Sequence, residues 1–319
     1  MTQAAKASIW QRLSAHPETG IFLALVALCV GITLVEPKFF SEMNLFLVSR
    51  QIAYTAIAAL GVFFVILTAG IDLSIGSVAA LGGVTCGLAM AAGASPVLGV
   101  LAGLASGLGI GLINGWIVAS LGVTPFIVTL GMLSMARGLV LVITHGEAVR
   151  DIPESFIQFG NSDWLGIPLV VWILVLMALA AQVVLRSSIF GLRVLAIGGN
   201  EEAARLSGVP VKRVKISTYA LAGFCAAVSG VLFVARFRSA QADAGKMMEL
   251  DAIAACVIGG TSLMGGRCTV LGVLIGATVM GVLHNGLVLL QVSAYWQELI
   301  IGAVIVLAAV LDMLRQKKA

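Results

Sequence analysis

Apolar residues follow one another along this chain in long runs that are separated by short polar stretches. About 20 consecutive apolar residues in a helix cross the core of a bilayer. This length divides the sequence into ten candidate spans, at 20–35, 52–69, 75–93, 96–119, 124–144, 168–185, 214–235, 251–265, 268–290 and 295–314. The first and eighth runs are short for a crossing, and the turn at 70–74 could instead be a re-entrant dip. The pattern predicts an all-α polytopic membrane helix bundle with about ten transmembrane helices.

The overall composition agrees with a membrane protein. Of the 319 residues, 60% are hydrophobic and 11% are charged, whereas roughly a quarter of the residues of an ordinary soluble domain are charged. The five cysteines lie in apolar runs without paired spacing, at Cys29, Cys86, Cys225, Cys256 and Cys268. We therefore expect neither a disulfide framework nor a metal site, and no cofactor in this chain.

The polar stretch at 186–215 sets the expected orientation. It holds six basic residues and only two acids, and an excess of Lys and Arg marks cytoplasmic loops. Ten spans then place both termini in the cytoplasm, with 12 of the 19 Lys and Arg on that side. We expect a cytoplasmic segment at 1–19, a transmembrane domain at 20–314 and a cytoplasmic tail at 315–319. The first run lacks a convincing small-residue cleavage site, which favours a retained span over a signal peptide.

A short helix is predicted inside this polar stretch. Asn200 is a good N-cap, acidic residues follow it, and Gly208 with Pro210 is a good stop. The result is a helix of about two turns outside the membrane, with a small apolar face at Ala203, Ala204 and Leu206. Two interpretations stay open, a plain connecting helix and a surface that binds a soluble partner.

The fourth span carries a stripe of glycines at every fourth position. These are Gly99, Gly103, Gly107, Gly111 and Gly115. Without side chains on this face, a neighbouring helix can approach to close backbone distance. We expect this helix to lie deep in the bundle, packed on its glycine face. The contact could be static packing or a surface on which helices slide.

An internal repeat is also visible. A shift of 171 positions superposes Asn114-Gly115 on Asn285-Gly286, and pairs spans four and five with spans nine and ten. In the predicted topology these pairs run in opposite directions, as inverted repeats do. A competing shift of 196 superposes Ala56-Ile-Ala-Ala59 on Ala252-Ile-Ala-Ala255. We prefer the inverted repeat because it leaves the first span and the helix of the polar stretch outside it.

Polar side chains within membrane spans are candidates for the substrate path. A charge there costs about 2.5 to 3.5 kcal/mol on insertion scales, so it is a functional candidate by default. Asp72 could simply cap the following helix, whereas Arg137 could pair with Asp72, bind a carbonyl, or line a polar path with nearby hydroxyls. The full set of path candidates is Asp72, Ser74, Asn114, Thr129, Ser134, Arg137 and Asn285.

No residues for energy coupling or catalysis are evident. The nearest approach to a phosphate-binding loop lies at 260–267, but the Lys and Ser/Thr of that motif are missing. Membrane carboxylates and histidines are too sparse to indicate a proton relay. An enzyme is therefore not predicted, and any ATP must be hydrolysed by another subunit.

Four blocks of the sequence resemble one transporter family. Glu202-Ala203-Ala204 with Gly208 is similar to the loop by which permease subunits of bacterial ABC importers dock on their ATPase. The longer run 198–208, together with 68–76, 129–138 and 249–266, resembles the ribose-type monosaccharide permeases. These blocks lie in order over nearly the whole chain, so the resemblance is specific to the family and not to the sugar.

This resemblance implies a membrane subunit of an ATP-driven sugar importer in the bacterial inner membrane. It implies a second permease copy, identical or related, a cytoplasmic ATP-binding subunit that holds ATP and Mg, and a periplasmic sugar-binding protein. Membrane lipid is the surrounding partner, and no nucleic acid is involved. The expected ATPase-coupling residues are Asn200, Glu201, Glu202, Ala203, Ala204, Arg205, Leu206, Ser207 and Gly208. The alternative is an ion- or proton-coupled secondary carrier that works without an ATPase.

Overall fold

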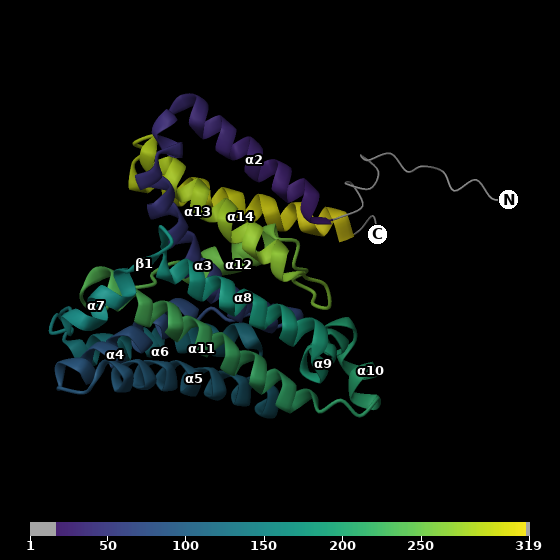
Figure 1. The fold of residues 1–319 in the computed structure, drawn as a ribbon. Helices are drawn as coiled ribbons and strands as arrows, with labels where there is room; N and C mark the ends of the chain where they lie inside the picture. The colour runs from purple at the N-terminus through teal and green to yellow at the C-terminus, as the bar shows by residue number, and fades with distance from the viewer. Residues whose placement is uncertain (1–16, 317–319) are drawn as a thin grey trace.

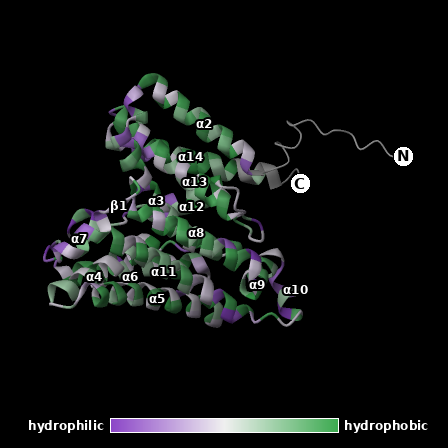
Figure 2. Cartoon of the chain, viewed as in Figure 1, coloured by the Kyte–Doolittle hydropathy of each residue, from purple (hydrophilic) through white to green (hydrophobic). Residues whose placement is uncertain are grey.

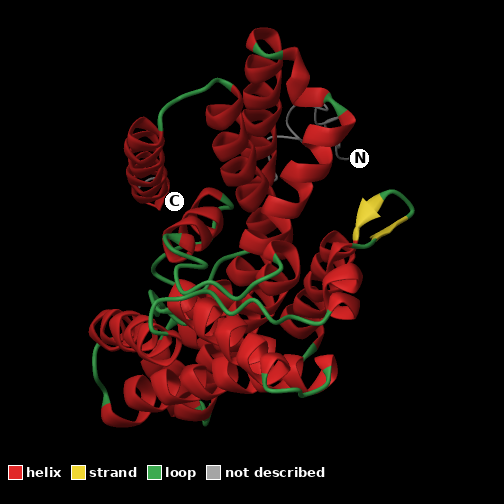
Figure 3. Cartoon of the chain, turned by 90° about the vertical axis from the view of Figure 1, so that its left-hand side faces the viewer, coloured by secondary structure: helices red, strands yellow, loops and turns green. Residues whose placement is uncertain are grey.

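The computed structural model describes residues 17–316, and most of them are helical (Figure 1). The segment 1–16 and residues 317–319, which belong to the two predicted cytoplasmic ends, lie outside the described residues. The α-helices are α2 (Pro17–Val35), α3 (Glu42–Leu67), α4 (Ile75–Ala91), α5 (Pro96–Leu121), α6 (Pro125–Thr144), α7 (Glu154–Asn161), α8 (Leu169–Ser187), α9 (Ile189–Gly199), α10 (Glu201–Leu206), α11 (Val211–Phe237), α12 (Met248–Ile258), α13 (Val270–Leu289) and α14 (Ala294–Gln316). A 3-10 turn, η1 (Pro37–Phe40), precedes α3. Strands β1 (Asp163–Trp164) and β2 (Ile167–Pro168) form one small antiparallel hairpin (Figure 3).

Seven of these helices are long and apolar enough to cross a membrane, namely α2, α3, α5, α6, α8, α11 and α13. Each corresponds to one of the predicted spans, and Figure 2 shows apolar residues along most of their length. Three shorter apolar helices lie at Ile75–Ala91, Ile189–Gly199 and Ala294–Val310. The prediction of an all-α membrane bundle is confirmed. The helix α9 was missed, because it lies in a stretch that was assigned to a polar loop.

The predicted eighth span, 251–265, is wrong as a continuous helix. The helix α12 covers only Met248–Ile258, and irregular backbone follows to Thr269. The reason is a tertiary contact, since the Gly266 N–H donates to the Leu67 carbonyl at 3.1 Å. A Cβ on Gly198 would overlap both Leu67 and Gly266. Three distant segments therefore meet through bare backbone, where a continuing helix would not fit.

The glycine stripe of α5 lies where the sequence predicts. All five glycines are buried, and α5 packs against α4 and α11. A Cβ on Gly103 would lie 3.0 Å from the Val231 side chain, and one on Gly115 would lie 2.7 Å from the Ile216 Cα. The stripe is therefore the seam along which α5 approaches α11 at backbone distance.

The four helices α3 to α6 are repeated as α11 to α14. Moved forward by 171 positions, the bounds of each of the first four fall within four residues of the bounds of its counterpart. The two central helices run antiparallel, because Ser229 donates to the Tyr54 carbonyl at 2.9 Å, while Gly61, later in α3, faces Ala222, earlier in α11. This is the inverted arrangement that the sequence favours. The shift of 196 would place α3 on a segment that is mostly loop.

The helix α3 forms the centre of the core. Its residues from Ala56 to Leu67 are buried almost completely, and α8, α11, α12 and α13 pack around it. The five cysteines are all free. Figure 1 shows α9 and α10 at one end of the bundle and α7 with β1 at the other. We call these the α10 end and the α7 end. The helix α2 begins, and α14 ends, toward the α10 end.

Candidate functional site

The α10 end carries the short helix that the sequence predicts. The Asn200 side chain accepts a hydrogen bond from the Ala203 N–H at 2.9 Å, which confirms it as the N-cap. Gly208 has a φ of +81°, a conformation that favours glycine just beyond a helix end. The helix α10 therefore begins and ends where its own sequence dictates.

Ion pairs hold Glu201 in place on one side of α10, and a neighbouring side is exposed. Glu201 binds Lys215 at 2.6 Å and Arg205 at 3.2 Å. Burial raises the pKa of the Glu201 carboxyl, but the hydrogen bonds and charges of Lys215 and Arg205 outweigh it, so the pKa is lowered. Glu202 points outward, and Leu206 is 82% exposed. An acid and a large apolar side chain are thus presented together at the surface.

The helix α9 links α10 to the core. Its residue Gly198 lies against Leu67 at the end of α3 and against Gly266 in the loop after α12. The N-cap of α9 is Ser188, whose hydroxyl accepts a hydrogen bond from the Gly191 N–H at 3.0 Å. The helix α9 therefore connects α10 to the end of the central helix α3.

Four of the predicted path residues meet in one buried network between α3 and α4. The Asp72 carboxylate accepts hydrogen bonds from the Ser74 N–H at 2.9 Å and from the Ser74 hydroxyl at 2.6 Å. Asn114 donates to the same hydroxyl at 3.0 Å, and Thr129 donates to the Ile71 carbonyl at 3.3 Å. All four side chains are at most 1% exposed. In these contacts Asp72 shapes the turn that precedes α4, but the N-cap of α4 is Ser74 and not Asp72.

The other three path candidates lie apart from this network. Arg137 donates to the carbonyls of Ala242 and Ala244 at 2.7 and 2.9 Å. Of the alternatives that the sequence left open, it therefore binds backbone carbonyls and does not pair with Asp72. Ser134 is exposed on α6, and the polar path that would join it to Arg137 and Thr129 stays a prediction. Asn285 exchanges hydrogen bonds with Asn44 at 3.0 and 2.9 Å. It therefore joins α13 to the start of α3.

The loop 238–247, which Arg137 holds, runs inward from the α7 end. Near its start, Ala240 bridges to Val149 through two backbone hydrogen bonds of 2.8 and 2.9 Å. Near its end, Gly245 lies against Gly76 in the first turn of α4. A Cβ on Gly76 would also meet Glu249 in the first turn of α12. Two short helices thus begin beside each other within the bundle, as discontinuous helices do at transporter binding sites.

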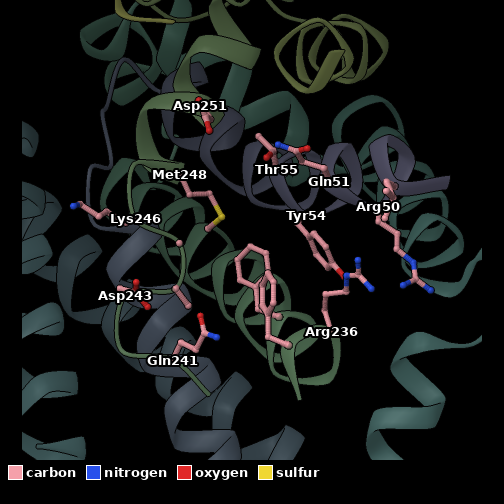
Figure 4. Close-up of a pocket in the computed structure, with 15 residues that line it drawn as sticks. Arg50, Gln51, Tyr54, Thr55, Arg236, Gln241, Asp243, Lys246, Met248 and Asp251 are labelled. Carbon is pink, nitrogen blue, oxygen red and sulfur yellow. The ribbon is translucent and has the colours of Figure 1, made fainter. Parts of the chain in front are cut away.

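A cavity of about 500 Å³ lies beside this loop. Its walls come from α3, from the last turns of α11, from the loop 238–247 and from the start of α12. Figure 4 shows Tyr54 and Arg236 on one side and Gln241, Asp243 and Lys246 on the other. Cavities of this size are typical of small-molecule sites. The lining combines aromatic rings, charges and neutral polar groups.

Some of the charged side chains at the cavity already have hydrogen-bond partners in the chain. Arg50 donates to the Asn161 carbonyl at 2.9 Å and to its side-chain oxygen at 3.3 Å. Asp251 lies 3.1 Å from a ring nitrogen of His284. In contrast, Gln51, Thr55 and Gln241 form no side-chain hydrogen bond with the rest of the described chain. Their hydrogen-bonding capacity faces the cavity.

Sequence reasoning missed this cavity, although one signal was present. Gln51, Tyr54 and Thr55 follow one another at helical spacing, so they share a face of a span that is otherwise apolar. The wall opposite could not be found in the same way. Gln241 and Asp243 were assigned to an outer loop, and nothing local shows that this loop turns inward.

Comparison with known proteins identifies the family of this chain. The family described as "Branched-chain amino acid transport system / permease component" matches residues 44–309. The chain belongs to this permease family. The ribose import permease RbsC of Bacillus subtilis (strain 168) is 42% identical over 94% of this chain and 93% of its own. RbsC of Escherichia coli (strain K12) is 43% identical over 92% of this chain and 93% of its own.

Permeases named for a second sugar are more distant. The L-arabinose ABC transporter permease AraH of Azospirillum brasilense is 33% identical over 98% of this chain and 92% of its own. No solved structure matches the chain. The resemblance to ribose-type ABC permeases is therefore confirmed, and the chain is a multi-pass membrane permease subunit and not an enzyme.

Proposed function

We propose that this chain is the membrane subunit of an ATP-driven importer that moves a ribose-like monosaccharide from periplasm to cytoplasm. The observation that carries the proposal is the identity of 42 to 43% to two ribose import permeases over more than nine-tenths of the chain. The structure supports it with a cavity that contains neutral polar groups and with an exposed helix at the opposite end. Ribose is the first sugar to test, and arabinose is the second.

The proposed assembly adds three components to this chain. A second permease copy, the same or related, lies beside this one in the inner membrane. A cytoplasmic ATP-binding subunit holds ATP and Mg at the α10 end, and a periplasmic sugar-binding protein delivers the substrate at the α7 end. Both termini are then cytoplasmic. The direction in which α2 begins and α14 ends supports this orientation.

Uptake by the reconstituted importer tests the proposal. The permease, the ATPase and the binding protein encoded beside it are placed in liposomes, and accumulation of labelled D-ribose is measured. We expect accumulation that requires ATP hydrolysis and is unaffected by ionophores. Uptake without the ATPase, abolished by a protonophore, would instead support the secondary carrier.

We propose that the residues 200–208 couple the permease to the ATPase, with Glu202 and Leu206 at the contact. Replacing Glu202 by Lys reverses a charge that is 66% exposed and has only a weak ion pair, at 3.5 Å to Arg205. Exposed pairs contribute about 0 to 1 kcal/mol, so the fold should survive. We expect at least a tenfold loss of ATPase co-purification and of uptake.

A matched control reverses the same charge at the other end of the bundle. Glu147 is exposed near the α7 end and forms no ion pair with the described residues. Glu147→Lys should leave ATPase co-purification at the wild-type level. Normal co-purification and uptake in Glu202→Lys would show that this helix does not form the ATPase contact.

A further inference from the structure

We propose that the cavity between α3, α11 and the loop 238–247 is a sugar-binding subsite within the permease itself. It would bind an uncharged monosaccharide through Gln51, Thr55 and Gln241, with Tyr54 and Phe233 as an apolar wall. This inference rests on the proposed function and extends it. It assigns part of the sugar selectivity to the permease and not to the delivering protein alone.

Three neutral side chains at the cavity can both donate and accept hydrogen bonds. Each amide of Gln51 and Gln241 offers two donors and an acceptor, and the Thr55 hydroxyl offers both. None of these groups is bonded to the rest of the described chain. Thr55 and Gln241 are half-buried and Gln51 is exposed, and a polar group that is removed from water is costly unless it finds a partner. Sugar hydroxyls, which also donate and accept, are matched partners for them.

Aromatic rings form one wall of the cavity. Tyr54 is only 7% exposed, and its ring centroid lies 4.8 Å from that of Phe233. Phe237 extends the wall, with its ring 5.9 Å from Phe233. A monosaccharide is amphipathic, because its C–H groups form apolar patches between the hydroxyls. Rings on one side and amides on the other fit both kinds of surface.

Charged side chains of both signs also line the cavity. Arg50 donates to the neutral Asn161, and Asp251 lies beside a ring nitrogen of His284, so both side chains already have hydrogen-bond partners in the chain. Arg236, Asp243 and Lys246 also line the cavity, and such groups can bind hydroxyls through several hydrogen bonds. An amino acid, with two opposite charges, is the competing ligand that the test must exclude.

The loop that carries Gln241 is fixed in advance. Arg137 binds the carbonyls of the residues on both sides of Asp243, and Val149 bridges the residue before Gln241. A wall held from both ends keeps its side chains in place, which lowers the cost of binding. The sugar would then meet a formed site and not a flexible segment.

Labelling of engineered cysteines tests occupancy of the cavity. Thr55→Cys and Gln241→Cys are introduced separately into the assembled importer, which is treated with a maleimide with and without D-ribose. We expect D-ribose to slow labelling of both, and L-leucine not to slow it. Ser134→Cys, exposed on α6 outside the cavity, should label equally fast in all cases, and the native cysteines give the background.

Uptake by alanine variants provides the second measurement. Loss of one neutral hydrogen bond should lower D-ribose uptake by about two- to tenfold in Gln51→Ala and in Gln241→Ala. Gln182→Ala, at an exposed position of α8, should transport normally. If the wild-type importer carries D-ribose but shows neither protection nor these losses, the subsite is refuted while the proposed function stands. Protection by L-leucine in place of D-ribose refutes the sugar assignment, and no sugar uptake by the wild type refutes the proposed function itself.

Discussion

Gly107→Leu should abolish folding of this permease. A Cβ at this position would overlap the Ala227 side chain and lie 2.5 Å from the Gly223 carbonyl oxygen. The opposing glycine offers no relief, because a Cβ on Gly223 would in turn overlap the Gly107 carbonyl. Overpacking costs typically 1 to 3 kcal/mol and sometimes more. Because backbone opposes backbone here, we expect a loss of about 3 kcal/mol or more and little folded protein in detergent.

A neighbouring glycine of the same helix is the control. A Cβ on Gly109 would have no heavy atom of another segment within 4 Å, so Gly109→Leu should give folded protein at the wild-type level. Size-exclusion profiles and thermal stability of the two variants can be compared directly. Equal yields would mean that α5 and α11 do not meet along the stripe. A tolerated Gly107→Ala that lowers uptake alone would favour the sliding interpretation.

The parts of the fold that depend on local sequence were predictable. Long apolar runs locate the seven membrane-length helices, since length and hydropathy are properties of each segment alone. The stop of α10 at Gly208 and its start at Asn200 also follow from the chemistry of single residues. The burial of the glycine stripe was predictable because a helix face without side chains allows a neighbouring helix to pack closely.

The parts that depend on distant contacts were not predictable. Nothing near Ile258 shows that α12 must end there, because the cause is the docking of Gly266 on Leu67 and Gly198. The cavity was hidden for the same reason. Its polar residues on α3 are visible in the sequence, but the opposite wall exists only because a loop more than 180 residues later turns inward.

For the polar residues within the membrane spans, the existence of a partner was predictable but its identity was not. A charged or polar side chain in a span predicts that a partner exists, and each of the candidates Asp72, Arg137 and Asn285 has one. The sequence did not identify the partners. Arg137 is bound by carbonyls 105 and 107 residues away. Every residue has a backbone carbonyl, so the sequence does not show which of them will be the partner.

Arg137→Leu should lower uptake by at least tenfold while the ATPase remains bound. The guanidinium forms two hydrogen bonds to the loop 238–247, and hydrogen bonds from charged groups contribute about 1.5 to 3 kcal/mol each. Glu249 and Asp243 lie close enough to add attraction. Leucine fills the space but leaves the carbonyls of Ala242 and Ala244 without their partner, so the loop should loosen and its cavity wall with it.

Two further variants separate this positioning role from a general effect on α6. Arg137→Lys keeps the charge and can donate to either carbonyl, although without the planar geometry of arginine, so it should recover part of the uptake. Ser134→Ala, one turn earlier on the exposed face, should be neutral. Protease sensitivity of the loop 238–247 provides a direct readout, and it should rise in Arg137→Leu and fall back in Arg137→Lys. Wild-type uptake with unchanged proteolysis in Arg137→Leu would refute the positioning role, whereas a loss of uptake in Ser134→Ala would restore a path along α6.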